Sequence, residues 1–156
     1  MGATLGMGAF LFLALVWWHY ARATQPFYPQ EGSPFSAQVS GILQPWGWPP
    51  LLLEVICLEM HWAFYRSGPI LLLDDLYGGV FVGLLIILAE AYSDPHLRRR
   101  LSLPGQAEPI LMRASVALVM AILYLFTRNL WLCVPIHLGL EAGLLHLLGA
   151  IHQCDS

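Results

Sequence analysis

Two ionisable residues stand inside a long apolar stretch near the C-terminal end of the chain. His137 and Glu141 lie four residues apart within the apolar run of residues 123–148. On a helix this spacing places both side chains on one face, one turn apart. Because a charged group is costly at membrane depth, such residues usually face a bundle interior or a wet cavity. The pair is therefore our first candidate for acid–base chemistry inside a membrane.

A second apolar segment, residues 51–66, carries four more candidates. Glu54 and His61 are seven residues apart and share one helical face. Glu59 and Arg66 have the same separation and share a face rotated from the first. Two interpretations stay open at this point. These groups line a functional cavity, or they hold helices together through hydrogen bonds, as polar residues in membrane bundles often do.

Composition places the chain among integral membrane proteins. Of its 156 residues, 58% are hydrophobic and 11% are charged, whereas a soluble domain is about 25% charged. The seven basic residues are all arginine, and the net charge is −3. The lipid bilayer is therefore the expected surrounding of the chain, and the lack of a basic face argues against nucleic-acid binding.

Five apolar segments are long enough to predict membrane-spanning helices. They are residues 3–20, 51–66, 76–92, 110–126 and 130–151. The predicted fold class is all-α, a polytopic transmembrane helical bundle of about five membrane-spanning helices. We divide it into an N-terminal helix and loop, residues 1–47, and a four-helix membrane core, residues 48–156.

Prolines, glycines and polar residues predict the connections. Residues 25–50 hold many helix breakers, which predicts an irregular loop with a short interfacial helix at residues 36–43. Residues 67–69, with the sequence Ser-Gly-Pro, predict the end of the second spanning helix. The polar residues 94–109 predict a surface loop between the third and fourth spans.

The start of the third span carries acids and small residues. Asp74 and Asp75 lie near its N-terminal end, where negative charge is electrostatically favoured. Gly78, Gly79 and Gly83 follow and form a small-residue face. Such a face permits a second helix to approach closely.

Loop charges predict an orientation and, with it, a depth for each candidate. Three arginines at positions 98–100 assign the loop between the third and fourth spans to the cytoplasm. Counting crossings makes the second and fifth spans antiparallel. At about 1.5 Å per residue, Glu59 and His137 both lie roughly 10 Å from the outer side. By the same rise, Glu54 and Glu141 both lie roughly 16–18 Å in. The matched depths predict one polar cavity, in which a carboxylate beside a histidine is a candidate general base for water.

A turn with the sequence YLFTRNLW, residues 124–131, precedes the helix that carries His137 and Glu141. This arrangement resembles the last motif of the CAAX-protease and bacteriocin-processing family of intramembrane proteins, where His is followed four residues later by Asn or Asp. Residues 59–66, EMHWAFYR, are similar to the family's first motif in the arginine and the aromatics before it. The family's second motif, Phe-x-x-x-His, has no counterpart, because Phe81 is followed at that spacing by leucine.

The resemblance implies a glutamate-dependent intramembrane endopeptidase acting on a peptide substrate. In such enzymes a Glu and a His activate water without a required tightly bound metal, so no cofactor is expected. By this resemblance Glu59 or Glu54 would be the base, and His137 would position the water or the oxyanion.

Three further residues take roles from the same resemblance. His61 would take the place of a missing family ligand, and Glu141 would orient His137. Arg66 would pair with an acid at the outer end. The protein is then expected to be a multi-pass protein of the bacterial inner membrane or an equivalent membrane.

Other functions stay open. The chain could be a non-catalytic subunit or scaffold of a larger membrane protein complex, which suits its small size, many aromatics and short loops. A zinc site with an open position could use four of the candidates, namely His61, His137, Glu141 and Glu54. A pigment or haem could take His137 as its axial ligand.

Overall fold

The computed structural model describes residues 2–24, 35–44, 46–103 and 105–153, and within these residues it is helical without a strand. The helices are α1 (Gly2–Thr24), α2 (Ser36–Leu43), α3 (Trp48–Leu73), α4 (Leu76–Ser93), α5 (Pro95–Leu101), α6 (Ala107–Thr127) and α7 (Leu130–Gln153). The predicted all-α helical bundle is confirmed. Most of the loop predicted over residues 25–50, at positions 25–34 and 45, lies outside the described residues.

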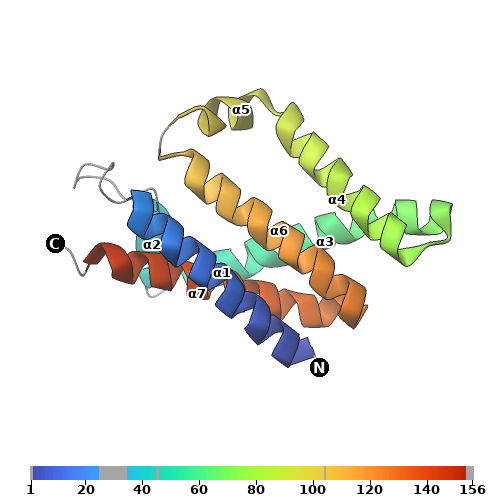
Figure 1. Cartoon of the computed structure of the whole chain (residues 1–156), viewed down its shortest axis with the longest axis horizontal. Helices are drawn as coiled ribbons and strands as arrows, with labels where there is room; N and C mark the ends of the chain where they lie inside the picture. The colour runs from blue at the N-terminus through green and yellow to red at the C-terminus, as the bar shows by residue number, and fades with distance from the viewer. Residues whose placement is uncertain (1, 25–34, 45, 104, 154–156) are drawn as a thin grey trace.

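The long helices after α1 form two hairpins, α3 with α4 and α6 with α7 (Figure 1). α1 packs against α7 and α6, and α3 packs against α4 and α7. α3 starts beside α2, at the end of the bundle that holds the C terminus, whereas α7 ends there (Figure 1). α3 and α7 therefore run in opposite directions, which allows residues from their middle turns to meet.

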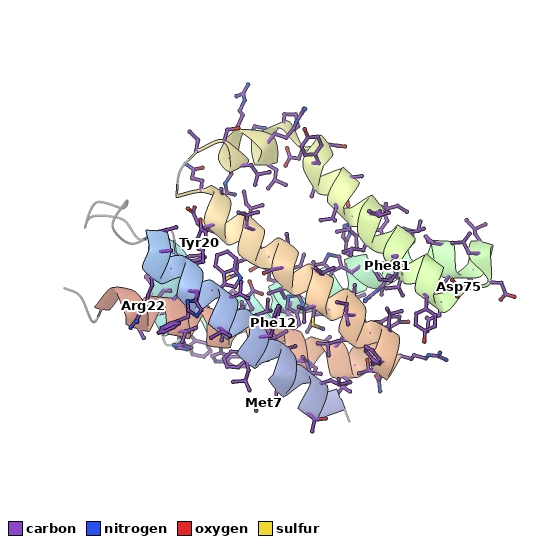
Figure 2. The ribbon with its side chains drawn as sticks, viewed as in Figure 1. Met7, Phe12, Tyr20, Arg22, Asp75 and Phe81 are labelled. Atoms are coloured by element: carbon purple, nitrogen blue, oxygen red, sulfur yellow. The ribbon has the colours of Figure 1, made fainter. Side chains whose placement is uncertain are left out.

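Four helices, rather than the five expected, are long and apolar enough to cross a membrane. They cover Thr4–Thr24, Leu76–Ser93, Ala107–Thr127 and Leu130–Ala150. The fifth expected span, α3, has 26 residues, a rise of about 39 Å, but Glu54, Glu59 and Arg66 lower its mean hydropathy. Large apolar side chains such as Phe12 and Phe81 are exposed on the outside of the bundle (Figure 2). The chain is a multi-pass membrane protein.

α3 continues to Leu73, so the predicted break at residues 67–69 is wrong. Pro69 stands inside the helix and removes one backbone donor. Membrane bundles tolerate such a proline when packing against a neighbouring helix holds the segment in place. Here α4 supplies that packing, because Gly79 lies against Ile70 in the added turn.

The turn between α3 and α4 consists of two aspartates. Asp74 adopts a left-handed conformation, with φ of 49°, and ends α3. The Asp75 carboxylate accepts hydrogen bonds from the backbone N–H groups of Tyr77 and Gly78, so it caps the start of α4. The predicted placement of acids at this helix start is confirmed.

Replacing Gly79 with alanine is expected to lower the free energy of unfolding by about 1–3 kcal/mol. A Cβ at this position would lie 2.5 Å from the Ile70 Cα, and a backbone atom cannot move aside alone. Gly68→Ala is the matched control, because a Cβ there has no atom within 4 Å. Unfolding of the purified chain in mixed micelles, followed by circular dichroism, measures both. Equal stability of the two variants would contradict the close approach of α3 and α4.

The sequence predicts the short helix α2 correctly but misses the short helix α5. α2 has the bounds predicted for it. The loop predicted over residues 94–109 is wrong in part, because it contains α5 and the first residues of α6. The Asp94 carboxylate accepts from the His96 N–H at 2.9 Å, and Pro95 suits the first helical position. This local capping explains why a polar segment forms a helix.

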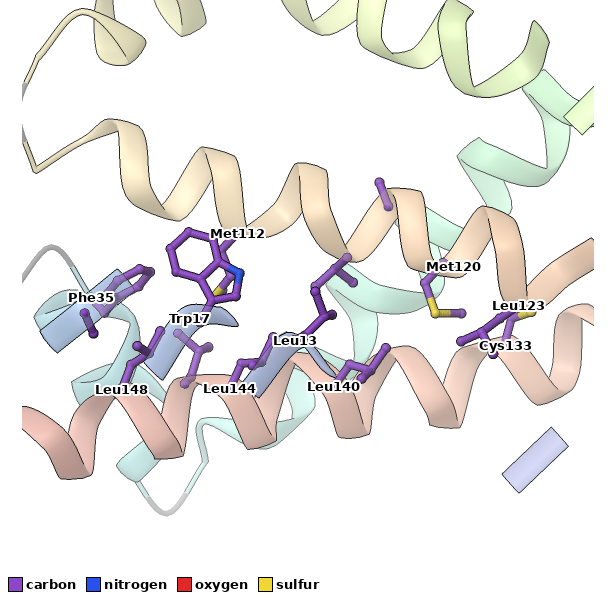
Figure 3. Packing of buried hydrophobic residues seen from close by; sticks show 14 of the residues in the cluster. Leu13, Trp17, Phe35, Met112, Met120, Leu123, Cys133, Leu140, Leu144 and Leu148 are labelled. Carbon is purple, nitrogen blue, oxygen red and sulfur yellow. The ribbon is translucent and has the colours of Figure 1, made fainter. Parts of the chain in front are cut away.

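The largest buried apolar cluster joins α1, α6 and α7 (Figure 3). Trp17 of α1 lies beside Met112 of α6, with Leu144 and Leu148 of α7 next to them (Figure 3). The Trp17 indole N–H donates to Ser115 Oγ at 3.1 Å, which satisfies its polar atom within the cluster. This core fixes α7 in place, and because the cluster includes Trp62 it also reaches α3.

Candidate functional site

Glu59 of α3 contacts His137 of α7, and the sequence predicts that both lie at the same depth. His137 Nδ1 and Glu59 Oε1 are 2.9 Å apart. Glu59 is 0% exposed and His137 is 2% exposed. The structure therefore brings the two predicted helix faces together in the interior of the bundle.

Arg66 contacts the other carboxylate oxygen of Glu59. Its Nη2 donates to Glu59 Oε2 at 3.4 Å, and the side chain is buried. The guanidinium also lies over the ring of Tyr124 of α6, 4.2 Å from the ring centroid. Glu59 thus balances a buried cation with one oxygen and orients an imidazole with the other.

A tryptophan fixes the plane of the imidazole. The rings of Trp62 and His137 are stacked, with centroids 5.1 Å apart and an interplanar angle of 10°. Sequence reasoning missed Trp62 and Tyr124 as site residues. The spacing of Glu59, Trp62 and Arg66 on one face of α3 is the signal that could have identified the tryptophan.

A second set of charges follows on the other side of the imidazole. His137 Nε2 lies 3.7 Å from Glu141 Oε2, which is too long for a hydrogen bond. Arg113 of α6 lies between two acids, with its Nε 3.7 Å from Glu141 Oε1 and its Nη2 paired with Glu54. Sequence reasoning missed Arg113 as a site residue, although a charge inside the apolar residues 110–126 was the available signal.

Together these residues form a network of ionisable groups that starts on α3, passes through α7 and α6, and returns to α3. In order, it comprises Arg66, Glu59, His137, Glu141, Arg113 and Glu54. Its first four members are buried, whereas the side chains of Arg113 and Glu54 are 44% and 41% exposed. The network therefore leads from the bundle interior to an accessible surface.

A cavity of about 340 Å³ lies at the accessible end of this network. Its polar wall contains Glu54, Arg113 and Glu141, and its apolar wall includes Leu51 and Leu145. Residues of α2 and of the segment that leads into α3 complete the lining. Glu141 is buried and yet lines this cavity, so it connects the open space with the imidazole behind it.

His61 lies outside the network, which corrects the expectation that it shares the cavity. Its Nε2 is 3.0 Å from Glu90 Oε2 of α4, and the two side chains are 45% and 49% exposed. α4 packs on the face of α3 that carries His61, and its glutamate supplies the partner. Five of the six predicted site residues are thus joined, and His61 belongs to a separate surface pair.

The ligand set considered for zinc is not assembled, because His61 points to α4 instead of the cavity. Among the residues that the structure describes, no group of three or more His, Cys, Asp or Glu could hold a metal ion. The groups available for chemistry here are an imidazole, carboxylates and guanidinium groups. Such a set can bind water and move protons.

No protein-family model matches the sequence, and the comparisons with curated proteins and with solved structures find no match either. The resemblance noted in residues 59–66 and 124–141 therefore stays a prediction. A conclusion about function therefore rests on the positions and contacts of the side chains.

Proposed function

We propose that the chain is an intramembrane hydrolase of the glutamate–histidine type that cleaves a peptide bond, as the CAAX-protease and bacteriocin-processing family does. The observation that carries the proposal is the Glu59–His137 pair, whose imidazole faces Glu141 at the inner end of an open cavity. Its location would be the bacterial inner membrane or an equivalent membrane, with arginines 98–100 on the cytoplasmic side.

Glu59 is suited to orient the imidazole. As the carboxylate partner of Arg66, it can only accept hydrogen bonds. His137 Nδ1 then carries the hydrogen of the 2.9 Å contact, and Nε2 is left with its lone pair. A buried carboxylate sets the tautomer of a general-base histidine in the same way in serine hydrolases. Stacking on Trp62 holds the ring plane.

The water to be activated would bind between His137 Nε2 and Glu141 Oε2. These atoms are 3.7 Å apart and Glu141 Oε2 is fully enclosed, so the Glu141 side chain would turn to admit a water that contacts both groups. His137 would remove a proton from that water as the water oxygen attacks the peptide carbonyl carbon. The same proton would then pass from His137 to the amide nitrogen as the C–N bond breaks, which releases the amine and the carboxylic acid. Arg113 lies next to Glu141 and would stabilise the negative charge that develops on the carbonyl oxygen.

This assignment differs from the roles that the resemblance implied. By the resemblance, Glu59 or Glu54 would be the base and Glu141 the orienting group, but Glu59 is enclosed by Arg66 and His137. Glu141 lines the cavity, where a substrate can reach it. The geometry therefore supports His137 and Glu141 as the reacting groups and Glu59 as the positioning residue.

Glu141→Gln is expected to slow peptide cleavage by about 100-fold, because a neutral amide cannot stabilise the positive charge that His137 gains when it takes the proton of the water. The assay uses the purified chain in liposomes with a library of fluorogenic transmembrane peptides. Glu90→Gln is the matched control, since that glutamate lies on the surface of α4 and contacts His61, outside the network. Cleavage by the Glu141→Gln variant at the wild-type rate, or no cleavage by the wild type, would overturn the proposal.

A second candidate function is a non-catalytic subunit of a membrane complex. The observation that favours it is the complete burial of Glu59, which makes the network a tie between α3 and α7. In that case the protein would co-purify in fixed stoichiometry with the other subunits of a larger complex. The Glu141→Gln variant would then assemble normally, and no peptide would be cleaved.

A further inference from the structure

The last turn of α5 forms a basic patch at one end of the bundle. Arginines 98–100 stand there, and all three are exposed. The spans of α4 and α6 end at Ser93 and begin at Ala107, so α5 lies between them at one membrane surface (Figure 1). The patch is therefore held at the level where a bilayer has its headgroups.

Side chains on the two faces of α5 fix the direction of the patch. Leu97 and Leu101 are partly buried, whereas the three arginines are exposed. The guanidinium of Arg98 lies 5.8 Å from the ring centroid of Tyr92, an exposed aromatic near the end of α4. The three cations therefore stand on the exposed side of α5, and the two leucines stand on its less exposed side.

The arginines of α5 differ from those inside the bundle. Arg66 and Arg113 are paired with glutamates, whereas none of residues 98–100 forms an ion pair within the described part of the chain. The side chain of Asp94, a nearby acid, accepts instead from the His96 N–H at the start of α5. Three guanidinium groups are thus left for a ligand from outside the chain.

We propose that arginines 98–100 bind the phosphate groups of anionic phospholipids in the leaflet that contacts α5. A guanidinium presents paired N–H donors that match phosphate oxygens, and it keeps its charge at every physiological pH. Anionic headgroups attract juxtamembrane cations, and the α5 patch has no competing carboxylate partner in the described residues. The inference is independent of the hydrolytic activity proposed above.

The test compares lipid retention by the purified full-length chain in detergent, measured by native mass spectrometry. Dioleoyl phosphatidylglycerol and dioleoyl phosphatidylcholine are added in equal amounts. Each arginine replaced by glutamine in the patch is expected to lower the preference for phosphatidylglycerol by about fivefold. The charge-matched control for Arg99→Gln is Arg128→Gln, which removes an exposed arginine at the α6–α7 turn, away from α5.

Each outcome decides the proposal. The proposal is supported if the preference for phosphatidylglycerol is lost in Arg99→Gln and in the variant with all three arginines replaced by glutamine. Arg128→Gln should keep that preference. Equal loss in Arg99→Gln and Arg128→Gln would show attraction by overall charge only and overturn it. If inorganic phosphate at millimolar concentration displaces phosphatidylglycerol completely, the patch is a site for free phosphate and the lipid proposal is overturned.

Discussion

Replacing Glu59 with alanine is expected to lower the free energy of unfolding by about 3–5 kcal/mol. The substitution leaves the buried guanidinium of Arg66 without its carboxylate and removes the partner of His137 Nδ1. An unpaired charge inside the bundle has neither water nor an acceptor to replace it. Unfolding of the purified chain in mixed micelles, followed by circular dichroism, measures the change.

The control for this prediction is Glu90→Ala. That glutamate also pairs with a histidine, but both side chains are about half exposed, and an exposed pair contributes about 1 kcal/mol or less. Combining Glu59→Leu with Arg66→Met should recover part of the lost stability, because both buried charges are then removed together. A loss of equal size in Glu59→Ala and Glu90→Ala would contradict the buried network.

His137→Gln is expected to slow peptide cleavage by about 10²–10⁴-fold. The amide of glutamine can still hydrogen-bond to Glu59, but it has no basic nitrogen to take a proton from water. Measurement uses the same peptides and liposomes as for Glu141→Gln. The stability of the variant should fall less than that of Glu59→Ala, since Arg66 keeps its carboxylate.

His61→Gln is the matched control for this second prediction. It makes the same chemical change on α3, in a surface pair that lies outside the network. Its cleavage rate should equal that of the wild type. A comparable loss of rate in both variants would mean that His137 acts through the fold, and the proposed chemistry would then be wrong.

The helices and their polar partners were largely predictable because periodicity and depth are local properties of a sequence. The bounds of α2 follow from the breakers around it. The spacing of Glu59 and Arg66 predicts a shared face of α3, and the depth argument predicts that His137 lies level with that face. These three residues are in contact in the structure.

The remaining features depend on which helix covers which face, and the sequence pattern does not encode this directly. Glu54 and His61 share a spacing that predicts a common cavity, but α4 packs beside His61 and supplies Glu90 as its partner. Arg113 is a lone charge near the start of an apolar segment, and only the fold shows that it lies between Glu54 of α3 and Glu141 of α7. At Pro69, packing against α4 prevails over the local rule that proline ends a helix.

The tight α3–α4 hairpin also bears on how the chain enters its membrane during synthesis. A charged residue at the centre of a single inserting helix costs about 2.5–3.5 kcal/mol, and α3 carries Glu54, Glu59 and Arg66. α4 is strongly apolar and follows after a turn of two residues, with Gly83 fitted against the Arg66 backbone. α3 would therefore partition poorly on its own and should wait in the insertion machinery until α4 emerges, so that the two leave it together as a preformed pair.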